Sequence, residues 1–180
     1  MFNNAHYIEK LYEQSFKLMQ VNGINDLDLM YDLVNFYKFS KSKRDFSKAL
    51  NYCKIGLKFS SKDPLLNYHA GDICLSLAKN SRELGKKLGK AKVNITKSAE
   101  LLHKSRKFFD DAIDYFKSAL KEQKRVEYIA SIHFGLSRAF FYLGSYDLAL
   151  ENLIIAKKHD SKENYRLFEK TIRQRLKRSR

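Results

Sequence analysis

One four-residue pattern occurs three times along the chain, and it constrains the fold more than any other feature. An aromatic residue is followed three positions later by Ala, four positions further by a bulky or thiol side chain, and three further by a small residue. Steps of three and four place all four side chains on one face of an α-helix. The small residues allow a neighbouring helix to approach closely. The three instances are Phe46/Ala49/Cys53/Gly56, Phe109/Ala112/Phe116/Ala119 and Tyr146/Ala149/Leu153/Ala156.

The scarcity of helix-ending residues agrees with an all-α fold. The 180 residues include one Pro and 7 Gly, so long stretches are free to be helical. Hydrophobic residues make up 44% of the chain, which is enough to build a core. The length fits one domain over residues 1–180. Cys53 and Cys74 lie in apolar helical patterns, and we expect both to be buried thiols.

The segment over residues 125–160 resembles a tetratricopeptide repeat, which is a pair of antiparallel helices. In that family a large residue, a Leu with a small neighbour and an aromatic mark the first helix, Gly-x-Tyr marks the turn, and spaced alanines mark the second. The matching residues here are His133, Leu136, Ser137, Phe140, Gly144, Tyr146, Ala149 and Ala156. Two positions depart from the family pattern, because His133 stands in place of Trp and Ser161 in place of the closing Pro.

The resemblance implies a right-handed α-α superhelix of helix-turn-helix repeats. A weaker version of the pattern begins at Asp63-Pro64, an N-cap followed by Pro in the first helical turn, and a more degenerate one precedes it. Helices at the two ends are expected to shield the stack. The expected units are an N-terminal helix in 1–24, repeats over 25–62, 63–123 and 125–160, and a basic capping helix in 161–180.

The spacing of the repeats predicts an insertion in the middle unit. Equivalent alanines of neighbouring repeats should lie about 34 residues apart. Ala112 and Ala149 are 37 apart, but Ala49 and Ala112 are 63 apart. About 29 extra residues therefore fall in the second unit. We expect them, at about 79–107, to form a helical hairpin that lengthens both helices, with its tip near Gly85 to Asn94.

The net charge of +15 is concentrated in two segments. Residues 79–107 hold 10 Lys or Arg against 2 Asp or Glu, a local excess of +8. Residues 157–180 hold 10 against 3, an excess of +7. The remaining 15 basic and 15 acidic residues balance, so the excess belongs to the insertion and to the C-terminal helix.

No pattern in the sequence points to catalysis, a metal or a cofactor. The five His residues are scattered, and none has a second His or Cys three or four positions away. The stretch Gly85 to Ala91 lacks the glycine spacing and the hydroxyl of a phosphate-binding loop. Asp110 and Asp111 are adjacent, so they point in different directions on a helix. We therefore expect a protein that is not an enzyme.

The resemblance instead implies a concave groove lined by the first helix of each repeat. Tyr and Arg commonly anchor interfaces because they bury much area and still offer hydrogen bonds. We expect this aromatic groove to hold a helix or peptide of a partner protein, which an acidic segment would suit. The candidate groove residues are Tyr31, Asn35, Tyr68, Asp72, Phe134, Arg138 and Tyr142. The competing interpretation is that half of them pack against the next helix or the C-terminal cap.

The two basic segments suggest an alternative function, which is binding of RNA, DNA or an anionic membrane surface. Phosphate contacts come from Lys and Arg and need no base-reading motif. The candidate residues are Lys86, Lys87, Lys90, Lys92, Arg173, Arg175, Lys177 and Arg178. Docking of the hairpin on an acidic protein is equally compatible with them. We expect a cytoplasmic protein, because there is no signal-like start and no apolar run approaching about 18 residues.

Overall fold

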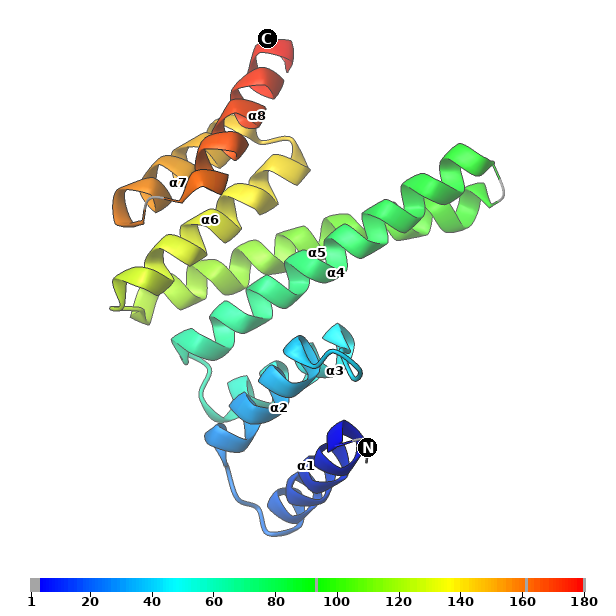
Figure 1. The fold of residues 1–180 in the computed structure, drawn as a ribbon, viewed down its shortest axis with the longest axis vertical. Coiled ribbons are helices and arrows are strands. Elements are labelled where there is room, and N and C mark those ends of the chain that lie inside the picture. The colour runs from blue at the N-terminus through cyan, green and yellow to red at the C-terminus, as the bar shows by residue number, and fades with distance from the viewer. Residues whose placement is uncertain (1–3, 93, 161, 180) are drawn as a thin grey trace.

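A computed structural model describes residues 4–92, 94–160 and 162–179 of the chain (Figure 1). Within these residues the fold contains eight helices and no strand, which confirms the all-α prediction. The helices are α1 (Asn4–Val21), α2 (Leu27–Phe39), α3 (Phe46–Phe59), α4 (Pro64–Ala91), α5 (Ile95–Glu122), α6 (Val126–Leu143), α7 (Tyr146–His159) and α8 (Glu163–Ser179).

Consecutive helices pack as pairs that follow one another along an elongated molecule (Figure 1). The pairs are α2 with α3, α4 with α5, and α6 with α7, while α1 packs on α2 and α8 packs on α7. α4 also contacts α2 on one side and α6 on the other, so the first helices of the three pairs are neighbours. The α4–α5 hairpin is much longer than the other pairs, and its tip projects beyond them (Figure 1).

Side-chain caps explain where several helices begin. The carboxylates of Asp26, Asp45 and Asp63 accept hydrogen bonds from backbone N–H groups at the start of α2, α3 and α4. Asn94 does the same for α5. These bonds satisfy N–H groups that have no partner within a helix. α6 ends at Gly144, whose φ of 88° lies in the left-handed region that favours glycine.

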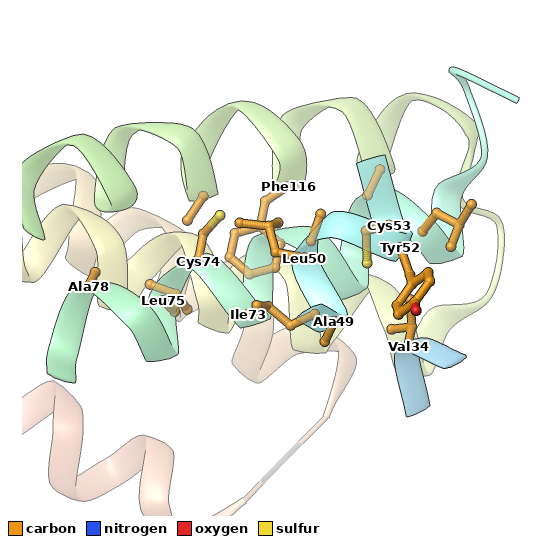
Figure 2. Packing of buried hydrophobic residues seen from close by; sticks show 14 of the residues in the cluster. Val34, Ala49, Leu50, Tyr52, Cys53, Ile73, Cys74, Leu75, Ala78 and Phe116 are labelled. Carbon is orange, nitrogen blue, oxygen red and sulfur yellow. The ribbon is translucent and has the colours of Figure 1, made fainter. Parts of the chain in front are cut away.

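The small residues of the repeated pattern are buried, as the pattern predicts. Ala49, Ala112 and Ala149 have no exposed surface. Gly71 and Gly135 are also buried, and a Cβ on either would lie within 3 Å of the Phe116 ring. Phe116 therefore fits between α4 and α6 because neither helix has a side chain at its contact point. Figure 2 shows its ring in the core formed by residues of α3, α4 and α5.

The predicted hairpin is present, but Gly85 and Gly89 lie within α4 and pack against α5. α4 continues as a helix through Gly85 and Gly89 to Ala91. A Cβ on Gly85 would lie 3.1 Å from the carbonyl oxygen of Ser98, so the glycine permits close contact with α5. The Ser98 hydroxyl donates a hydrogen bond of 2.8 Å to the Gly85 carbonyl. The tip thus lies between Ala91 and Ile95, at the far end of the expected range, and Gly85 allows helix packing.

The Phe116 contact predicts a coupled pair of substitutions. In Gly135→Ala the new methyl group would lie 2.5 Å from Cζ of Phe116, a distance too short for real Cβ contacts, so the ring or one of the helices must shift. We expect a net loss of about 1–2 kcal/mol, since overpacking outweighs the gain in helix propensity. Phe116→Leu should lower the free energy of unfolding by less in the Gly135→Ala background than in the wild type. Urea unfolding of the four proteins measures this coupling, and strictly additive effects would contradict the proposed contact.

Candidate partner-binding surface

A small hollow lies between α4, α6 and the beginning of α8, and four of the seven predicted groove residues line it. Tyr68 and Asp72 come from α4, and Phe134 and Arg138 come from α6. The hollow has a volume of about 140 Å³, enough for one side chain of a partner. The other lining residues are Phe116, Ser131, Gly135, Lys162, Asn164 and Tyr165.

The aromatic walls of the hollow are held by contacts within the chain. The Phe134 ring lies 4.6 Å from the Tyr165 ring and 5.8 Å from the Phe168 ring, measured between centroids. Tyr68 packs edge-on against Tyr128 at 5.4 Å. The C-terminal helix therefore forms one wall of the hollow in addition to covering the end of the stack. Phe134 in particular is occupied by this packing, as the competing interpretation from the sequence anticipated.

Arg138 is a cation of the hollow that forms no ion pair with any carboxylate that the structure describes. Its guanidinium carbon lies 5.8 Å from the centroid of the Phe134 ring, a cation–π contact. None of the described carboxylates lies within 4 Å of it. In contrast, the Lys162 ammonium pairs with Asp160 at 2.7 Å. A partly buried Arg without a counter-ion favours an incoming carboxylate, which it can bind with two parallel hydrogen bonds.

A buried lysine next to the hollow is a feature that the sequence analysis missed. Lys38 of α2 is only 6% exposed, and its ammonium lies 2.8 Å from Oδ2 of Asp72 and 3.1 Å from Nδ1 of His69. This cluster joins α2 to α4, and it neutralises the carboxylate that we expected in the groove. The available signal was spacing, because Lys38 lies seven residues after Tyr31 and therefore on the same helix face.

The same cluster fixes the protonation state of His69. Burial, and to a smaller extent the neighbouring Lys38 cation, lower the pKa of His69 to about 4. The ring is therefore neutral at pH 7, and Nδ1 accepts a hydrogen bond from the Lys38 ammonium. The ring proton then resides on Nε2.

α2, the first helix of the first pair, contributes less to an open groove than the sequence predicted. The Tyr31 hydroxyl donates a hydrogen bond of 2.6 Å to Oδ2 of Asp63. The other carboxylate oxygen of Asp63 accepts from the N–H of Leu66, so Tyr31 also supports the start of α4. Asn35 is exposed and remains accessible to a partner.

Tyr142 does not lie with the other groove residues. Its ring stacks on Phe109 of α5, with centroids 5.0 Å apart and planes 14° apart. The guanidinium of Arg82, on α4, lies 5.4 Å from the centroid of the Tyr142 ring. Tyr142 therefore belongs to the junction of α6 with the long hairpin, where a second hollow is found.

The predicted basic residues are exposed, but they form two separate groups. One group lies at the distal end of α4 and the other on α8, and the two project in different directions (Figure 1). The side chain of Arg173 is also bonded to Glu169 at 2.7 Å. A single ligand would have to bridge the space between them to contact both. The exposed residues are Lys86, Lys87, Lys90 and Lys92 in the first group and Arg173, Arg175, Lys177 and Arg178 in the second.

The pKa of His69 predicts a specific change in acid stability. Between pH 6.5 and about 4 the unfolded chain binds a proton on His69 that the folded protein does not. Stability should therefore fall as the pH decreases through this range, by at most about 1.4 kcal/mol per pH unit from this group. The His69→Gln variant keeps an acceptor for Lys38, and its stability should fall less steeply as the pH decreases. Urea midpoints at several pH values test this, and parallel curves for both proteins would disprove it.

The part of the chain that the structure describes holds no group of three or more His, Cys, Asp or Glu placed to bind a metal ion. None of the described helices combines the length and the apolar character needed to cross a membrane. No protein-family model matches the chain, and no curated protein matches it.

Proposed function

We propose that this protein is a non-enzymatic scaffold with a tetratricopeptide-like architecture that binds a segment of a partner protein. The observation that carries the proposal is Arg138, a cation without an ion pair among the described residues, in a hollow with aromatic walls. The arrangement of α2, α4 and α6 as neighbours supports it, because a partner segment lying across them would contact all three pairs. The partner is a helix or an extended peptide with a carboxylate side chain as its anchor.

The size and charge of the hollow define the kind of contact. A volume of about 140 Å³ accepts one Asp or Glu side chain, and the Arg138 guanidinium can pair with its carboxylate. Asp72 does not oppose this charge, since Lys38 neutralises it. The rest of the segment would then follow α2 past the exposed Asn35. Tyr68 and Phe134 shield the ion pair from water and so strengthen it.

The buried cluster beside the hollow has a structural role in this proposal. Lys38, His69 and Asp72 bind one another, and both acidic and basic members are satisfied. Burying a charge is tolerated when it is paired and hydrogen-bonded. The cluster fixes the spacing of α2 and α4 and thereby the shape of the partner site.

Charge reversal at Arg138 tests the proposal. Arg138→Glu should weaken partner capture from the native cells at least about tenfold, because it places a second carboxylate opposite the anchor. Lys17→Glu on the exposed side of α1 changes the net charge equally and serves as the matched control. Quantitative affinity purification followed by mass spectrometry compares the two variants with wild type. Equal recovery of all partners by Arg138→Glu and wild type would show that the hollow is not the site.

The hairpin offers a second candidate function, which is binding of RNA, DNA or an anionic membrane surface. Among the described cations of residues 79–107, only Lys97 has an ion pair, with Glu100 at 3.2 Å. The other described cations of residues 79–107 form no ion pair with a described carboxylate, so their charge is available to a polyanion. Lysines without local partners make phosphate contacts that release counter-ions and depend strongly on salt.

A salt titration tests this second function. The fourfold variant with Gln at positions 86, 87, 90 and 92 removes the basic group at the end of α4. If this group binds duplex DNA, the slope of log affinity against log salt should decrease by up to about 3.6, at about 0.9 per phosphate contact. Fluorescence anisotropy with a labelled duplex between about 50 and 200 mM salt measures the slope. Identical slopes for the variant and wild type would show that the basic group at the end of α4 does not contact DNA.

A further inference from the structure

A second hollow lies where the end of α6 meets the base of the projecting hairpin. Its volume is about 320 Å³, more than twice that of the hollow beside Arg138. Residues of three helices form it, so its shape depends on the packing of α6 against the α4–α5 pair. The lining residues are Arg82 and Lys86 from α4, Leu102, Ser105, Arg106 and Phe109 from α5, and Tyr142 and Leu143 from α6.

Three cations face this hollow, and no carboxylate is among the described residues that line it. Arg82, Lys86 and Arg106 therefore repel one another when the hollow holds only water. None of the three forms an ion pair within the described part of the chain. An anion in their midst would remove this repulsion, so binding it would also stabilise the fold.

Arg82 is held in place before any ligand arrives. Its Nη1 donates a hydrogen bond of 2.8 Å to the carbonyl oxygen of Tyr142, in the last turn of α6. Its guanidinium also lies over the Tyr142 ring at 5.4 Å. Arg82 thus offsets the partial negative charge at the end of α6. Lys86 and Arg106 are exposed and remain free to contact a ligand.

The remaining lining is apolar and partly open to solvent. Leu102 is 40% exposed, although it stands on the side of α5 that faces the hollow. Leu143 and the edge of the Tyr142 ring are partly exposed beside it. A ligand with an apolar part and an anionic end would cover these side chains with the apolar part and contact the cations with the anionic end.

From this arrangement we propose that the hollow binds a phosphoryl group attached to an aromatic or apolar carrier. The dianionic phosphate pairs with Lys86 and Arg106, with the fixed Arg82 beside it, since guanidinium and ammonium groups are the usual phosphate ligands. The carrier packs against Leu102, Tyr142 and Leu143. The carrier is either a small metabolite or a phosphorylated side chain. This site is separate from the hollow beside Arg138 and does not depend on the function proposed for it.

Titration with phenyl phosphate tests the proposal. We expect saturable one-to-one binding that shifts the phosphorus resonance of the ligand and the Nε–H signals of Arg82 and Arg106 in NMR spectra. Benzoate and phenol should bind at least about tenfold more weakly, because one carries a single charge and the other none. Inorganic phosphate should also bind more weakly, since it lacks the carrier. Nucleoside monophosphates and a phosphotyrosine peptide then distinguish a small metabolite from a phosphorylated side chain.

Matched variants locate the site. Lys86→Gln and Arg106→Gln alter exposed side chains and should each weaken binding of phenyl phosphate about tenfold without changing the helical circular dichroism. The double variant Lys87→Gln/Lys90→Gln removes two exposed charges that do not line the hollow, and it should bind as wild type does. The proposal is overturned if phenyl phosphate does not saturate, if phenol binds equally well, or if the control variant loses as much affinity as Arg106→Gln.

Discussion

The packing of Phe116 between two glycines determines how the middle of this molecule is assembled. Its ring lies over Gly71 of α4 and Gly135 of α6, where any side chain would collide with it. α5 thereby joins its own hairpin to the next pair of helices. The contact between α4 and α6 follows from this, and with it the hollow that contains Arg138.

Much of this architecture is predictable from the sequence because it depends on local periodicity. Ala49, Ala112 and Ala149 are fully buried, as their spacing within the helices requires. The lengthened hairpin also follows from simple spacing, since the distance from Ala49 to Ala112 exceeds one repeat. Such features need only the geometry of a single helix and the rule that small residues accompany close packing.

The sites are less predictable because they depend on how helices distant in sequence are placed against each other. Lys38 of α2 meets Asp72 of α4 with α3 between them in the sequence, and the spacing from Tyr31 places Lys38 on a helix face without indicating which carboxylate pairs with it. Tyr142 follows Arg138 by one helical turn, yet it faces α5 while Arg138 faces the hollow. Gly85 was ambiguous for a related reason, since glycine suits both turns and close helix contacts.

The outer part of the long hairpin has almost no hydrophobic core of its own. Among the described residues from Lys79 to Lys104, only Gly85 and Ser98 are buried. One hydroxyl-to-carbonyl bond, from Ser98 to Gly85, joins the two helices within this stretch, and a second, from Ser105 to Ala78, joins them at its base. Local opening needs less free energy where few apolar groups are buried. We therefore expect the outer hairpin to open locally at a lower free energy than the helix pairs of the stack, which would let its charges reach positions that a rigid hairpin could not.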